Sequence, residues 1–176
     1  MIGGAAPSAA TTGSERQAVG RPWLLAAAPS EPQAVREWQG SGAAWLRPGL
    51  VFTAVSVAAS LVHAAVNVPG PEDVGAPLGL VLDGPVFYRE QIFGREAGYT
   101  VLLLPSAGEI WRVAGSVVES PRALLLVPAP NRCEPDDHGP WWVLPPGGSG
   151  ALCTPTLLAS LIGVGRERIA REGDVL

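Results

Sequence analysis

The stretch Leu50-Val51-Phe52-Thr53-Ala54-Val55-Ser56-Val57 leads without a break into Ala58 to Val68, which is rich in alanine. The first part carries β-branched and aromatic residues, which favour a strand, and the second part spaces its apolar residues as one face of a helix. The turn dipeptides Pro48-Gly49 and Pro69-Gly70 flank the whole stretch. We therefore expect a buried strand that is followed by a buried helix.

The same stretch permits a second interpretation. From Leu50 to Val68 its only ionisable side chain is that of His63, and an uncharged run of this length approaches the length of a membrane-spanning helix. Polar residues interrupt the run, and the composition changes in its middle, so the strand and helix are favoured. A membrane-associated module is the less favoured alternative.

The composition indicates one globular domain from a GC-rich bacterial genome. The chain has 176 residues, of which 47% are hydrophobic and 16% are charged, and all 12 basic residues are arginine. The formal net charge is −4. Strong binding to duplex nucleic acid usually requires a cationic face, and nothing in the sequence indicates one, so we do not expect such binding.

The two ends of the chain differ in composition from its middle. Residues 1–20 are rich in Gly, Ala, Ser and Thr, and they lack the basic and apolar regions of a secretory signal. We expect a disordered tail at 1–20, a folded domain at 21–165 and a charged tail at 166–176. Two cysteines are too few for a disulfide framework, and a cytoplasmic protein with reduced thiols is the simpler expectation, although a single bridge stays open.

Strand-like and helix-like segments alternate through the folded region. Further strands are expected at Ala43 to Leu46, Thr100 to Leu104, Ala123 to Val127 and Trp141 to Leu144. Helices are expected at about Ser30 to Gly40 and Thr156 to Ile162, and Leu78 to Leu82, Val86 to Tyr88 and Ile110 to Val113 are short apolar runs. This mixture predicts an α/β (α+β) domain with a single mixed sheet of about five to seven strands, covered by a few helices.

The order of several short motifs resembles a known family. From Val117 onward the chain reads Glu119, Arg122, Leu124-Leu125-Leu126-Val127, Pro128-Ala129-Pro130, then Trp142 with Pro145-Pro146 and a closing helix. The middle of the chain adds Gly84-Pro85-Val86-Phe87 and Gly98-Tyr99-Thr100-Val101-Leu102-Leu103. Over residues 20–165 this order resembles the small bacterial relatives of the bifunctional primase–polymerase N-terminal domain, in the archaeo-eukaryotic primase superfamily.

The resemblance implies a nucleotidyltransferase fold that lacks the residues needed for nucleotidyl transfer. An active member needs two acids one residue apart on a strand, a histidine or basic residue for the phosphates and a further acid, so that Mg²⁺ or Mn²⁺ is held by several oxygens. The strand from Val51 to Val57 has no acid, and Tyr99 and Thr100 stand where the histidine is expected. We therefore expect no cofactor. An active enzyme with displaced acids, Asp83 and Glu119, is the alternative.

Other candidate site residues are fewer. The resemblance places Arg122, Tyr99 and Trp142 in the area where a nucleotide would bind. Cys133, His138 and Cys153 are the weak candidates for a metal site, since their spacing matches no standard zinc pattern, and a solvated acidic loop is the simpler interpretation.

The expected function is thus a non-catalytic primase–polymerase-like domain that acts as a binding or regulatory module. Its expected partners are a nucleotide, single-stranded DNA or another protein. A protein-interaction module with an unrelated function is a further alternative.

Overall fold

Seven strands form two sheets in the computed structural model, which describes residues 20–90, 95–147 and 150–174. The larger sheet has five antiparallel strands in the spatial order β5 (Ser116–Val118), β2 (Thr53–Ala58), β4 (Gly98–Leu103), β3 (Val86–Arg89) and β7 (Trp141–Leu144). The smaller sheet pairs β1 (Ala43–Leu46) with β6 (Leu125–Pro128), also antiparallel.

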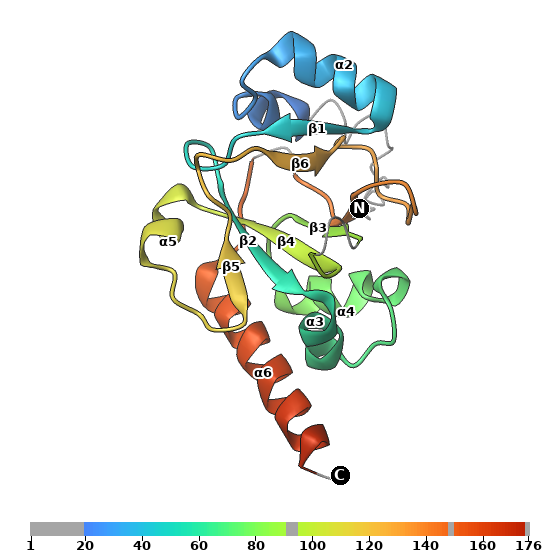
Figure 1. Ribbon diagram of the computed structural model, residues 1–176, viewed down its shortest axis with the longest axis vertical. Coiled ribbons are helices and arrows are strands. Elements are labelled where there is room, and N and C mark those ends of the chain that lie inside the picture. The colour runs from blue at the N-terminus through green and yellow to red at the C-terminus, as the bar shows by residue number, and fades with distance from the viewer. Residues whose placement is uncertain (1–19, 91–94, 148–149, 175–176) are drawn as a thin grey trace, which may run out of the picture.

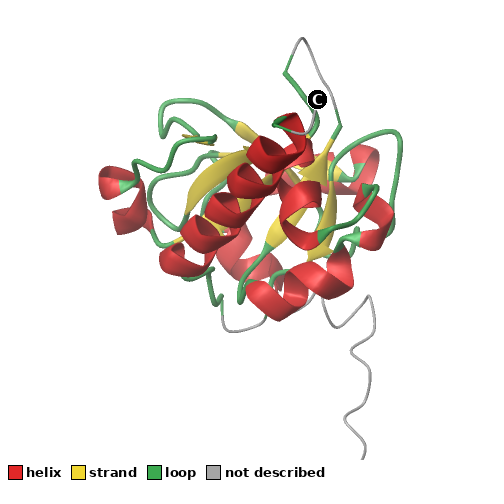
Figure 2. Ribbon diagram, turned by 90° about the horizontal axis from the view of Figure 1, so that it is seen from below, coloured by secondary structure: helices red, strands yellow, loops and turns green. Residues whose placement is uncertain are grey.

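Helices cover the sheets from two sides. They are α2 (Glu31–Ser41), α3 (Ala59–Val66), α4 (Gly75–Val81), α5 (Pro105–Ile110) and α6 (Pro155–Gly173), with a 3₁₀ turn at η1 (Pro71–Asp73) and a helical segment at residues 20–25. In Figure 1, α2 and the β1–β6 sheet lie above the five-stranded sheet, and α3, α4 and α6 lie below it. Figure 2 shows α6 running across the sheet, with other helices around it.

Strand alternation divides the five-stranded sheet into two apolar faces. Toward the helices, the core includes Val55, Val101 and Leu158, all at most 2% exposed. Toward the small sheet, a second core is built around Phe87 and Trp142, which are 0% and 1% exposed. The molecule therefore has an α+β architecture in which the larger sheet separates two cores.

The structure confirms that a strand leads directly into a helix where the sequence stretch from Leu50 to Val68 predicts one. β2 begins at Thr53, and α3 follows at Ala59. β2 pairs with β4 on one side and β5 on the other, and its side chains from Thr53 to Val57 are buried on both faces of the sheet, which explains its apolar character. None of the helices in the described residues is long and apolar enough to span a membrane, and the stretch from Leu50 to Val68 is not one helix.

Three details of the predicted architecture are wrong. The predicted single mixed sheet is instead two sheets, because β1 and β6 pair only with each other. The strands of both sheets pair antiparallel. The run from Leu78 to Leu82 belongs mainly to α4. The last helix does not end near Ile162 but continues through residues 166–173, where a charged tail is predicted.

Gly165 lies inside the last helix, where it has a packing role. A Cβ atom at Gly165 would lie 2.3 Å from the carbonyl oxygen of Leu61 on α3, so this position allows the two helices to pack closely rather than ending α6. The predicted tail at residues 1–20 lies outside the described residues, apart from Gly20.

Candidate functional site

Strand register gathers polar side chains at one end of the face that points away from α3, α4 and α6. Ser56 on β2 is paired with Thr100 on β4, and one step further along the strands Gly98 is paired with Arg89 on β3. Glu119 follows β5, where its amide donates a hydrogen bond to the carbonyl of Ala54. We call Ser56, Thr100, Arg89, Glu119 and the nearby Arg95 the polar cluster.

Glu119 is the centre of the polar cluster. Ser56 Oγ donates a hydrogen bond of 2.6 Å to Glu119 Oε1, and Arg95 Nη2 forms an ion pair of 3.1 Å with the same oxygen. The hydroxyls of Ser56 and Thr100 are 3.2 Å apart. The side chain of Glu119 is only 12% exposed, whereas that of Arg95 is 55% exposed. The carboxylate is therefore fixed inside the cluster while Arg95 faces solvent.

Arg89 is the least satisfied member of the cluster. Its Nη1 donates a hydrogen bond of 3.2 Å to the carbonyl of Glu96, but its buried Nε has no hydrogen-bond partner among the described residues. Burial lowers the pKa of Arg89, the positive charge of Arg95 lowers it further, and Glu119 opposes both effects. Two guanidinium groups thus share one carboxylate, which leaves an excess of positive charge in a partly desolvated place.

The donor set of the cluster suits an anion better than a cation. A hard cation such as Mg²⁺ prefers several carboxylate or carbonyl oxygens, and here the one carboxylate already accepts bonds from Ser56 and Arg95. The described part of the chain contains no group of three His, Cys, Asp or Glu side chains that could hold a metal ion. Guanidinium groups, by contrast, are the usual ligands of phosphate and carboxylate groups.

The two acids that the enzyme alternative requires occupy different environments. Asp83 accepts hydrogen bonds from the backbone amide of Thr154 at 2.7 Å and from its hydroxyl at 2.5 Å. These bonds lower the pKa of Asp83, and they tie its carboxylate to the residue that precedes α6. Glu119 has other partners, on the opposite side of the sheet, so the structure does not join the two acids in one site.

The rings predicted to contact a nucleotide are both buried. Tyr99 is 1% exposed in the core beneath the helices, and its hydroxyl lies 2.7 Å from Nε2 of His63. Trp142 is 1% exposed in the other core, and its indole nitrogen donates hydrogen bonds to the carbonyls of Pro128 and Ala129. Neither ring presents a face on which a base could stack.

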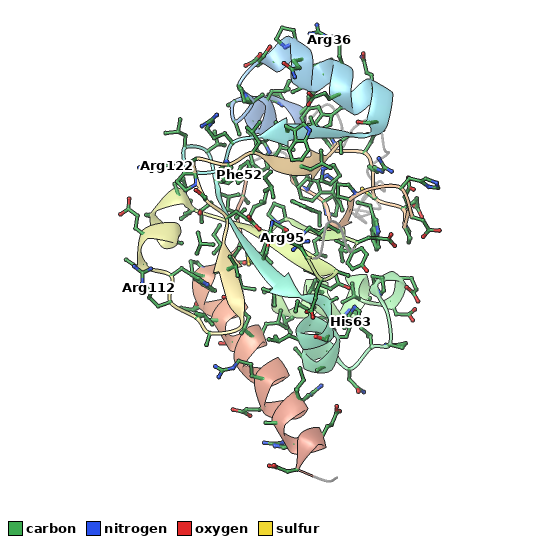
Figure 3. All side chains as sticks on the ribbon, viewed as in Figure 1. Arg36, Phe52, His63, Arg95, Arg112 and Arg122 are labelled. Atoms are coloured by element: carbon green, nitrogen blue, oxygen red, sulfur yellow. The ribbon has the colours of Figure 1, made fainter. Side chains whose placement is uncertain are left out.

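Arg122 does not join the polar cluster either. It is exposed, and its backbone amide donates a hydrogen bond to Ser120 Oγ. Figure 3 places Arg122 at the side of the molecule, whereas Arg95 lies over the middle of the sheet. Of the sequence-predicted site residues, only Glu119 is therefore a member of the cluster.

Of the three candidate metal ligands, Cys153 lies apart from Cys133 and His138. Cys153 is buried in the core beneath the helices, where burial raises the pKa of its thiol to about 12. Cys133 packs against the other core, and it lines an open hollow of about 720 Å³ together with His138. His138 Nδ1 lies 3.2 Å from Asp136, which also pairs with Arg132. Cys133 and Cys153 are not bridged to each other, and the loop is an acidic surface loop.

Arg89 and Arg95 were missed by sequence reasoning. The alternation Val86-Phe87-Tyr88-Arg89 does place Arg89 on one face with Phe87, which is a usable signal. Which face that is, and that it also carries Ser56, depends on the pairing of β3 with β4 and of β4 with β2. Local sequence does not contain this pairing.

Comparison with known proteins adds no further constraint: no family model matches the chain, and no significant similarity to a curated protein or a solved structure was found.

Proposed function

We propose that this domain is a non-catalytic binding module that holds an anionic ligand, a nucleotide through its phosphate groups, at the polar cluster. The observation that carries the proposal is the guanidinium of Arg89, whose buried Nε has no partner among the described residues and whose neighbour is a second arginine. A buried donor without a partner is costly, and a phosphate oxygen would supply the missing acceptor. The primase–polymerase resemblance is consistent with a nucleotide in this role.

The same geometry argues against an active enzyme. Metal-assisted nucleotidyl transfer needs acids that converge on one site, whereas the polar cluster offers a single carboxylate that is already bonded to Ser56 and Arg95. Arg95 is more than half exposed, so it is free to turn toward a ligand while Ser56 holds Glu119 in place. A nucleotide ligand also fits the cytoplasmic location expected from the sequence.

Calorimetric titration with ATP, GTP and short single-stranded DNA tests the proposal, with and without Mg²⁺. Loss of a charge-assisted hydrogen bond weakens binding by about 1.5–3 kcal/mol, so Arg89→Met should reduce nucleotide affinity about tenfold to a hundredfold. Arg36→Met is the matched control, because Arg36 is an exposed arginine on α2, at the far end of the molecule in Figure 3. We expect this variant to bind as the wild type does.

Two results would overturn the proposal. One is the absence of nucleotide binding at millimolar concentration, and the other is equal affinity in the wild type and Arg89→Met. Incorporation of nucleotides into a primed template with Mn²⁺ would instead support the enzyme alternative. Binding of single-stranded DNA without free nucleotides would shift the ligand to a polynucleotide phosphate backbone.

A further inference from the structure

A small cavity of about 170 Å³ lies where α2 meets the small sheet, which Figure 1 shows at the top of the molecule. Trp45 on β1 and Leu124, just before β6, form one wall of it. Strand alternation turns Trp45 away from its buried neighbours Ala44 and Leu46, so that it is 48% exposed. Pockets for whole small molecules usually measure about 300–1,000 Å³, so this cavity suits a single small chemical group.

The start of α2 supplies the other wall of the cavity. Ser30, Gln33, Ala34 and Glu37 line it, and they are spaced by three or four residues, which places them on one face of the helix. Two hydrogen bonds fix the carboxylate of Glu37 there. The backbone amide of Trp45 donates a bond of 3.0 Å to Oε2, and Gln33 Nε2 donates a bond of 2.8 Å to Oε1. A carboxylate and an exposed indole therefore border the same small space.

The negative charge of Glu37 is not balanced by a neighbouring basic group. Its two hydrogen-bond donors are neutral, and it is the only charged side chain among the described residues that line the cavity. No arginine in the described part of the chain forms an ion pair with it. Glu119 in the polar cluster differs, because Arg95 neutralises it. A cleft whose lining carries one sign of charge attracts ligands of the opposite sign, so the cavity favours a cation.

We propose that the cavity binds a quaternary ammonium group, of the kind that choline carries. A cation is attracted to the face of an aromatic ring, and among the aromatic side chains tryptophan attracts it most strongly. Trp45 thus adds a second cation-binding group beside the carboxylate of Glu37. The size of the cavity limits the bound part of the ligand to its ammonium head.

The apolar part of the lining selects a methylated ammonium over a primary one. The side chains of Pro29, Ala34 and Leu124 contain no hydrogen-bond acceptor. A primary ammonium has three N–H donors, and burying them against such a wall costs their hydrogen bonds to water. A quaternary ammonium has no donor to satisfy, so it presents methyl groups to this wall while its charge lies between Trp45 and Glu37. The site shares no residue with the polar cluster and does not depend on nucleotide binding.

Two-dimensional NMR of the nitrogen-labelled protein tests the proposal by titration with choline chloride at millimolar concentration. We expect saturable shifts of the indole N–H of Trp45 and of the side-chain amide of Gln33, which both belong to the cavity. The matched ligand is the neutral isostere of choline, in which carbon replaces the nitrogen. Since it lacks the charge, it should bind at least about tenfold more weakly. Equal binding of the two ligands, or no shift with choline, overturns the proposal.

Variants of the two cation-binding residues test their separate roles. Trp45→Leu keeps an apolar wall but removes the ring, and it should weaken choline binding about tenfold, whereas Trp45→Phe should recover part of the loss. Glu37→Gln should also weaken binding about tenfold by removing the charge. Glu31→Gln is the matched control, because Glu31 is an exposed acid on the same helix that does not line the cavity. Equal losses in Glu31→Gln and Glu37→Gln would reduce the effect to overall charge and contradict the site.

The same head group occurs in free choline and in choline-containing lipids, and sedimentation with vesicles distinguishes these sources. Retention on phosphatidylcholine vesicles, but not on phosphatidylglycerol vesicles, would identify a lipid head group as the ligand, provided that Trp45→Leu abolishes the retention. Choline binding without retention would identify a free ligand. Retention that Trp45→Leu leaves unchanged, together with no shift on choline addition, would place the contact elsewhere and overturn the proposal.

Discussion

The two faces of the five-stranded sheet use the same strands in different ways. Beneath the helices, the face is mainly apolar, with Thr53 buried near α5 and the hydroxyl of Tyr99 paired with His63. The opposite face is apolar only where the small sheet covers it, around Phe87 and Trp142. Beyond that cover lies the polar cluster, with Ser56, Glu119 and two arginines. One face is therefore mainly a packed core, and the other is divided between a packed core and the polar cluster where we propose that a ligand binds.

The comparison shows why a strand without acids can still border a site. Alternate residues of β2 point to opposite faces, so Val55 and Val57 enter the core beneath the helices while Ser56 reaches Glu119. The strand contributes a hydroxyl that orients a carboxylate from elsewhere, and the arginines contribute the charge. Substitutions on each face should accordingly have separable effects.

The largest loss of stability is expected where the two sheets meet. Trp142→Ala should lower the free energy of unfolding by about 3–5 kcal/mol, because it empties a fully buried site and leaves the carbonyls of Pro128 and Ala129 without their indole donor. Urea denaturation measures the loss. Trp45→Ala on β1 is the control, since its ring is 48% exposed and should cost about 1 kcal/mol or less. Similar losses in both variants would contradict the role given to Trp142.

On the helix-covered face, two glycines of one helix should respond in opposite directions. Gly165→Ala should destabilise the protein by about 1–3 kcal/mol, because the new methyl group would meet the carbonyl oxygen of Leu61. A Cβ atom at Gly163 has nothing within 4 Å, so Gly163→Ala should stabilise the protein by about 0.5–1 kcal/mol through helix propensity. Thermal unfolding of both variants separates the two effects, and a stabilising Gly165→Ala would show that α3 and α6 do not pack this closely.

On the polar face, replacing Arg89 should weaken the proposed nucleotide binding without loss of stability. The buried Nε without a partner costs about 1–3 kcal/mol, and that penalty is offset in part by the bond to Glu96 and the attraction to Glu119. Arg89→Met should therefore leave the free energy of unfolding unchanged or raise it by up to about 1 kcal/mol. Urea denaturation without ligand measures this, with Arg36→Met as the control. A loss of more than about 1 kcal/mol would mean that Arg89 is structural.

The contrast between the faces also explains which features the sequence could predict. The strand and helix of the Leu50 to Val68 stretch and the strand from Trp141 to Leu144 follow from local composition and flanking turns, and the structure has both. The polar cluster joins residues that are far apart in the chain, such as Ser56 and Glu119, and it depends on the order of the strands. The sequence prediction ended the last helix at Ile162, whereas α6 continues to Gly173 and passes through Gly165, whose role depends on Leu61 of another helix.

The smallest expected effect is a pH dependence on the helix-covered face. Burial lowers the pKa of His63 below 6.5, and Glu72 opposes the shift only in part. The unfolded chain therefore binds a proton more readily than the folded one, so stability is lost as the pH falls through 6.5 toward the lower pKa of the folded state. His63→Gln should flatten this dependence between about pH 7 and about pH 5, as followed by the midpoint of thermal unfolding.

His138→Gln is the natural control, because the only other histidine of the chain has a side chain that is 90% exposed. If both variants keep the slope of the wild type, then burial does not hold the His63 imidazole in its neutral form, and the pH dependence of stability comes from another ionisable group.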